Sequence, residues 1–150
     1  MSKLRLTNGD DHPEAAQKHL LDAQALLSQQ RADGAAYLSG YVVECALKSL
    51  WLLETGVPAG TAVLWKGREG HDLKGLSSQI AAFASVATAK TARYFKTATS
   101  GVPQGPIAGW TPDMRYRPPE ISLADARAWY LVADIVFHET IAQMRLDGTL

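Results

Sequence analysis

Two charged residues, Glu44 and Lys48, lie four positions apart in a segment whose other side chains are almost all apolar. On a helix this spacing places both charges on one face. If the helix is buried, the charges must pair or reach water, because an unpaired charge in a protein interior is costly. Either the two residues form an ion pair that holds helices in register, or they line a ligand pocket beside a later proline-rich segment.

His71 stands at the predicted start of a helix, after Gly70 and before Asp72, with Arg68 three residues upstream. The N-terminus of a helix attracts anions, and histidine exchanges a proton near neutral pH. His71 is therefore a candidate catalytic or phosphate-binding residue, and Arg68 is a candidate ligand-binding residue. The alternative is that His71 only caps the helix or bonds to a loop carbonyl.

Arg115, Tyr116 and Arg117 form a further candidate cluster, with Trp110 a few residues upstream. Guanidinium groups bind phosphates through paired hydrogen bonds, and aromatic rings stack on nucleobases. We expect Arg115 to clamp a phosphate as a second catalytic residue. Trp110, Tyr116 and Arg117 are candidate ligand-binding residues. The same pattern also fits an anchored loop, in which Trp110 and Tyr116 are pinned to the core. In that case Arg115 would reach Glu44.

The remaining histidines and the single cysteine show no spacing for further chemistry. His12, His19 and His138 lack a second histidine three or four residues away, and no cysteine pair is present. We therefore expect no metal and no cofactor. Cys45 lies in the apolar segment, which predicts an inert packed thiol. One cysteine excludes an internal disulfide framework and fits a reducing compartment, so we expect a cytoplasmic protein.

The chain length and composition predict a single globular domain over residues 1–150. Apolar residues make up 47% and charged residues 20% of the chain, and 15 basic side chains balance 15 acidic ones. There is thus no overall positive field that would indicate nucleic-acid binding. Residues 35–53 form the longest apolar stretch, and the two charges at its centre argue against a membrane span. No signal peptide is visible.

Hydrophobic spacing predicts an all-α fold, an antiparallel four-to-five-helix bundle. After a loose polar lead-in over residues 1–11, Asp10 or Asp11 should cap a first helix that runs to about residue 30. A second helix over 35–55, capped by Asp33, is apolar nearly all round and belongs inside a bundle or across an oligomer interface.

The second half of the chain predicts two further helices separated by long loops. Residues 59–70 should form a loop whose Val63, Leu64 and Trp65 tuck onto the core. A third helix should run over 71–83 and continue through 87–99. Residues 100–121 hold five of the seven prolines, which predicts a long functional loop without regular structure. Ser122 and Asp125 should cap the last helix, which Gly148 ends.

Taken together, these elements resemble the HEPN family of small helical domains. The resemblance covers about residues 14–147. It rests on segments 22–27 and 36–48, on His71 with the two residues after it, and on Trp110 and Arg115-Tyr116 before the last helix.

The resemblance implies an antiparallel, commonly dimeric bundle linked to nucleotides or RNA. Many family members are metal-independent RNases with an arginine, four to six residues, and then a histidine near the start of the last helix. This chain departs from that pattern, because two residues separate Arg68 from His71 and ten separate Arg127 from His138. It looks more like the members that lack robust catalysis.

We therefore expect a homodimeric HEPN-type module that binds a nucleotide, an RNA or a partner protein. The resemblance implies a nucleotidyltransferase as one such partner, in a toxin–antitoxin or defence-type system. Two alternatives stay open on the sequence alone. The first is a metal-independent endoribonuclease with a non-standard site at His71 and Arg115, and the second is a structural adaptor.

Overall fold

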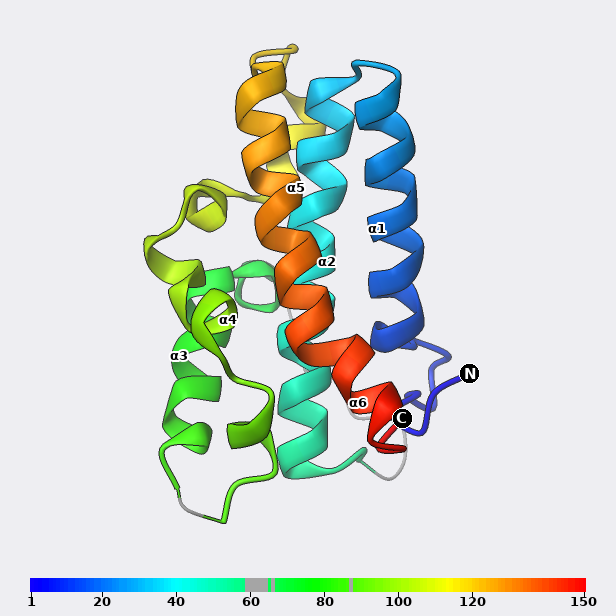
Figure 1. Cartoon of the computed structure of the whole chain (residues 1–150), viewed down its shortest axis with the longest axis vertical. Helices are drawn as coiled ribbons and strands as arrows, with labels where there is room; N and C mark the ends of the chain where they lie inside the picture. The colour runs from blue at the N-terminus through cyan, green and yellow to red at the C-terminus, as the bar shows by residue number, and fades with distance from the viewer. Residues whose placement is uncertain (59–64, 66, 87) are drawn as a thin grey trace.

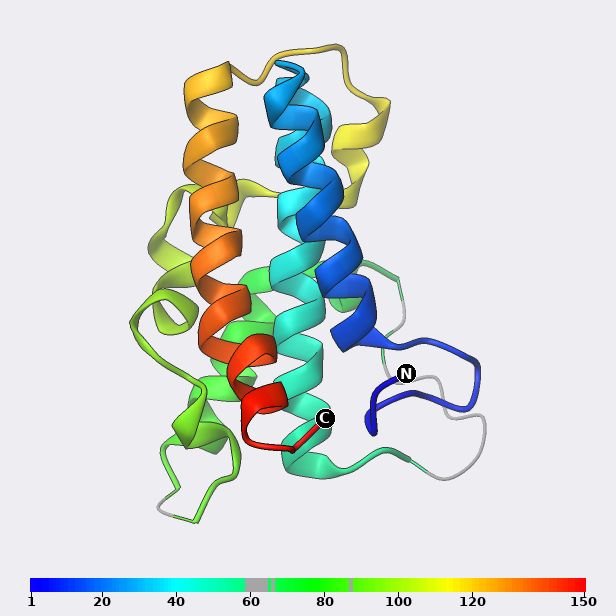
Figure 2. The same cartoon turned by 45° about the vertical axis from the view of Figure 1, so that its right-hand side comes forward.

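The computed structural model describes residues 1–58, 65, 67–86 and 88–150, and over these residues it is all-helical, without strands. This confirms the predicted all-α class. The long helices lie side by side and nearly parallel to the long axis (Figures 1 and 2). They are α1 (His12–Ser28), α2 (Ala32–Thr55) and α5 (Leu123–Phe137), with α3 (Leu73–Ala84) and α4 (Thr97–Gly101) packed beside them.

Helix α2 forms the centre of the bundle, between α1, α5 and α3. Most of its side chains are buried, including Val42, Leu47 and Leu50. Two buried serines form hydrogen bonds within the helix itself. Ser39 donates its hydroxyl to the carbonyl of residue 35, and Ser49 donates to that of residue 45. The near-continuous apolar surface of this helix is thus covered by the chain's own helices.

The ends of the first and last helices follow the predicted local signals. The Asp11 carboxylate accepts a hydrogen bond from the backbone N–H of Glu14, and Ser122 does the same for Asp125. Gly56, with a φ of +85°, follows the end of α2 in the left-handed region that glycine tolerates.

The predicted start of α2 is wrong by one turn, and Asp33 is not its cap. Helix α1 ends at Ser28 and α2 already begins at Ala32, so Asp33 lies inside the first turn. Its Oδ1 atom accepts hydrogen bonds from the backbone N–H groups of Glu120 and Ile121, at 2.9 and 3.1 Å. The carboxylate therefore fastens the segment before α5 to α2.

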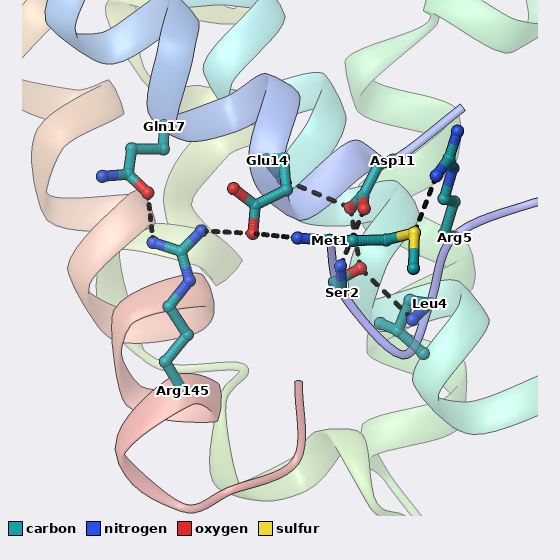
Figure 3. Close-up of polar contacts among 8 residues, drawn as sticks. All are labelled: Met1, Ser2, Leu4, Arg5, Asp11, Glu14, Gln17 and Arg145. Carbon is teal, nitrogen blue, oxygen red and sulfur yellow. Dashed lines mark hydrogen bonds and ion pairs between the residues drawn. The ribbon is translucent and has the colours of Figure 1, made fainter. Parts of the chain in front are cut away.

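Residues 1–11 are not a loose lead-in, because polar contacts tie them to the start of α1 (Figure 3). Ser2 donates its backbone N–H and its hydroxyl to the two oxygens of Asp11, at 2.8 and 2.7 Å, and Leu4 is buried. On the neighbouring turn, Glu14 accepts from Arg145 of α6 (Gln143–Leu146) at 3.0 Å. Because the carboxylate that caps α1 also binds Ser2, the arm and the helix are held together.

The third helix does not continue through residues 87–99. Helix α3 ends at Ala84, and the chain then forms the 3-10 turn η2 (Thr91–Arg93) and the short α4. Residue 87 lies outside the described residues. Alanine and threonine supply few large apolar side chains here, so packing does not extend the helix.

Two glutamates, one on α2 and one between α5 and α6, bind the segment over residues 91–99. Glu54 of α2 accepts from the backbone N–H and the hydroxyl of Thr91, at 2.9 and 3.0 Å. Glu139 accepts from the backbone N–H groups of Ala98 and Thr99, at the start of α4. Glu139 lies in the π-helical turn η6 (His138–Ala142), which interrupts the last helix between α5 and α6.

Residues 100–121 do not form the predicted structureless loop. Val102 and Ile107 are fully buried, and Trp110 is 2% exposed. Within the segment lie three 3-10 turns, namely η3 (Val102–Gln104), η4 (Pro106–Gly109) and η5 (Pro112–Tyr116). Proline fits the beginning of each turn because its fixed φ is helical and it lacks the N–H group that would be unsatisfied there.

Candidate functional site

Glu44 and Lys48 form an ion pair in the interior of the bundle. Both are buried, with 3% and 6% of their surface exposed. Lys48 Nζ donates to Glu44 Oε1 at 2.7 Å, while the other oxygen, Oε2, lies 2.8 Å from Nδ1 of His71. His71 closes the 3-10 turn η1 (Gly67–His71) just before α3. One buried carboxylate therefore joins the central helix to the residue predicted to carry chemistry.

This contact decides how the His71 ring is oriented and which nitrogen faces outward. An ionised carboxylate only accepts hydrogen bonds, so Nδ1 of His71 must carry the proton that it shares with Glu44. No described residue bonds to the other ring nitrogen, Nε2. His71 thus offers Nε2 for proton exchange or for a hydrogen bond to a ligand.

Lys48 also contacts the ring of Trp65. Its ammonium lies 4.9 Å from the centroid of the Trp65 ring, a cation–π contact, and Trp65 packs edge-on against Trp51 at 5.5 Å. His12 meets the Trp65 ring at 5.2 Å. Trp65 therefore packs onto the core as predicted, while Val63 and Leu64 lie outside the described residues.

His12 is a neutral imidazole within this cluster. Its Nε2 atom is buried and has no hydrogen-bond partner among the described residues. Burial, and then the nearby Lys48 charge, lowers the pKa of His12 to about 4.

Trp110 forms a wall next to His71 by packing directly on α2. Its Nε1 donates to the backbone carbonyl of Tyr37 at 2.9 Å, and a Cβ added to Gly40 would lie 2.1 Å from that same nitrogen. The Tyr41 ring packs edge-on against both Trp110 and His71, with centroid distances of 4.9 and 6.3 Å. Burial, and then the hydrogen bond to Tyr37, raises the pKa of Tyr41, so this phenol stays neutral.

A cavity of about 440 Å³ opens between η1 with the start of α3 on one side and η4 with η5 on the other. It is lined by both signs of charge and by polar and aromatic groups. The hydroxyl oxygen of Thr111 is buried there without a partner among the described residues. The lining side chains that could bind a ligand are Arg68, His71, Lys74, Trp110, Thr111 and Asp113.

The structure brings part of the predicted site together. His71, Arg68 and Trp110 line the cavity, whereas Glu44 and Lys48 are not among its lining residues. Glu44 instead bonds to His71, and Lys48 bonds to Glu44. These residues come from α2, η1 and the segment before η5, which are far apart in sequence.

Arg115, Tyr116 and Arg117 are not among the residues that line the cavity. The Arg115 guanidinium lies over the Tyr116 ring at 4.8 Å, and Arg117 pairs with Glu120 at 3.6 Å. Tyr116 is 76% exposed, so the expectation that it anchors the loop is wrong, whereas Trp110 does anchor it. Arg115 does not reach Glu44, whose oxygens are bound by Lys48 and His71.

Most of the cavity's lining residues were not predicted as site residues, among them Lys74, Thr111 and Asp113. Lys74 lies one helical turn after His71, a spacing that could have identified it. Thr111 and Asp113 follow Trp110 closely, but they became relevant only once the chain between η4 and η5 was seen to face η1.

Among the described residues, neither the cysteine nor a cluster of metal-binding side chains forms a second reactive site. Cys45 is buried, and burial raises the pKa of its thiol to about 12, so it is inert as predicted. Within the described ranges no three or more His, Cys, Asp or Glu side chains are grouped to hold a metal ion. None of the helices found there is long and apolar enough to cross a membrane.

Comparison of the chain with protein-family models, curated proteins and solved structures finds no match.

Proposed function

We propose that this protein is a HEPN-type module that binds a nucleotide in the cavity beside His71, without robust catalysis of its own. One observation carries the proposal: the cavity contains an imidazole oriented by the buried Glu44, together with the cations of Arg68 and Lys74. The cavity volume lies within the range of roughly 300–1,000 Å³ that small-molecule sites occupy.

The distribution of charge in the cavity supports a ligand with two chemically different ends. Arg68, His71 and Lys74 come from η1 and α3 and suit a phosphate. Thr111, on the opposite wall, offers a hydroxyl without a partner among the described residues for a hydrogen bond to the ribose or the base. A nucleoside phosphate presents both kinds of group in one molecule.

Calorimetric titration of the purified protein with AMP tests this proposal. We expect saturable binding that His71→Ala weakens by at least about 10-fold, the equivalent of ~1.4 kcal/mol. His138→Ala is the matched control, because His138 is exposed beside Asp134 and does not line the cavity. The absence of saturable binding by AMP would remove the basis of the proposal.

A second candidate is a metal-independent endoribonuclease. The Glu44–His71 hydrogen bond supports it, because a carboxylate that fixes one imidazole nitrogen leaves the other to act as general acid or base. Arg68 lines the cavity and would clamp the phosphate in place of Arg115.

Incubation of a labelled structured RNA with EDTA separates these two functions. An RNase would cleave the RNA, and both His71→Ala and Arg68→Ala would abolish cleavage while Arg115→Ala retained it. Intact RNA with the wild-type protein would leave only the binding role.

We also propose that the protein forms a homodimer. The apolar surface of α2 is buried within one chain and so does not itself call for a partner. Support comes instead from Leu131 and Ile135, which are exposed one turn apart on α5.

A further inference from the structure

Arg68 and Asp113 face each other across the mouth of the cavity. Arg68 belongs to η1 and Asp113 to η5, so the contact joins the two walls. Their closest charged atoms, Nη2 and Oδ2, are 3.8 Å apart, and the side chains are 96% and 55% exposed. The distance and the exposure make this a loose, solvated ion pair.

The same guanidinium is almost fully exposed and is therefore accessible to an incoming phosphate. A phosphate would engage the fork of Arg68 through paired hydrogen bonds, which the 3.8 Å contact with Asp113 does not provide. As long as Asp113 stays beside Arg68, however, its negative charge offsets the attraction of the guanidinium for a second anion.

We infer that Asp113 is a built-in counter-anion, which the phosphate of a ligand must displace from Arg68 in order to bind. This inference rests on the proposed nucleotide-binding function. Asp113 thereby lowers the affinity of the open cavity for any single phosphate. A ligand that also uses Thr111 or the Trp110 wall compensates for that loss through its second end. Asp113 thus limits the affinity of the cavity for phosphate groups and is not part of the phosphate-binding group.

Glu69 supplies a control that is matched in charge. Its side chain also lines the cavity, but no ion pair joins it to Arg68. Asp113→Asn and Glu69→Gln therefore remove the same charge from the same lining, and only the first change frees the guanidinium.

The test titrates inorganic phosphate and AMP into the wild-type protein and the two variants at fixed ionic strength. We expect Asp113→Asn to tighten binding of both probes by about 2- to 5-fold, the range of an exposed ion pair. Glu69→Gln should have a smaller effect. In an Arg68→Gln background, Asp113→Asn should give no gain.

The outcomes separate this inference from the proposal on which it rests. Binding without a gain in Asp113→Asn overturns the counter-anion role and leaves the nucleotide site standing. An equal gain in Glu69→Gln, or a gain that persists without Arg68, also overturns it, because the effect would then be a general reduction of negative charge. If neither probe binds the wild-type protein or Asp113→Asn, both ideas fail.

Discussion

The indole ring of Trp110 lies against the backbone of α2 at Gly40, with no room for a side chain between them. A Cβ at Gly40 would approach the indole nitrogen to 2.1 Å, and that nitrogen donates to the carbonyl of Tyr37 one turn earlier. This contact fixes the wall of the cavity to the central helix. A glycine within a helix costs stability through backbone entropy, which the close approach of Trp110 explains here.

The first prediction concerns this contact. We expect Gly40→Ala to displace Trp110 and to lower the free energy of unfolding by ~1–3 kcal/mol, as overpacking does. Binding of AMP should weaken as well, because Trp110 lines the cavity. Urea unfolding and calorimetry measure the two effects. Gly109→Ala is the control, since a Cβ there meets nothing within 4 Å, and equal losses in both variants would contradict the prediction.

The second prediction concerns the buried ion pair. Glu44→Ala leaves the ammonium of Lys48 buried without its hydrogen-bonded partner, so we expect a loss of ~3–5 kcal/mol in urea unfolding. Glu120→Ala removes the exposed partner of Arg117 and should cost less than ~1 kcal/mol. A loss below ~1 kcal/mol for Glu44→Ala would show that the pair contributes little to the fold.

The third prediction is a pH dependence from His12. Its pKa is about 4 in the folded protein, below the ordinary value of 6.5, so the unfolded chain binds this proton first as the pH falls. The contribution to stability is therefore complete above pH 6.5 and is lost as the pH drops toward 4. The full loss is at most ~3 kcal/mol.

His12→Phe tests this assignment, because a phenyl ring preserves the edge contact with Trp65 but cannot take up a proton. Its free energy of unfolding, measured by urea titration at a series of pH values, should fall less steeply than that of the wild type between pH 6.5 and 4. Identical slopes for the two proteins would assign the effect to other groups.

The fourth prediction concerns assembly. If two chains pair through α5, Leu131→Asp should convert a dimer into a monomer without changing the helical content, because Leu131 is exposed. Sedimentation equilibrium measures the mass and circular dichroism the helix. A wild-type protein that is monomeric at high micromolar concentration would refute the dimer.

The predicted helix ends are confirmed where local spacing decides the structure. Asp11 and Ser122 cap their helices because a capping side chain bonds to an N–H group only three residues away. By the same local logic Asp33 should have been a cap, but its carboxylate instead binds backbone groups of residues 120 and 121. Spacing along the chain does not reveal such a partner.

By itself the sequence determined the helical class, because this depends on contacts within one or two turns. It placed Glu44 and Lys48 on one face of an apolar helix, but whether they pair and whether that helix lies inside the bundle was decided by the tertiary structure. Only the tertiary structure decided that His71 meets Glu44 and that Arg68, rather than Arg115, lines the cavity. Those relationships join residues that lie 27 or more positions apart, such as His71 and Glu44. They depend on how buried anchors such as Ile107 and Trp110 seat the 3-10 turns on the bundle.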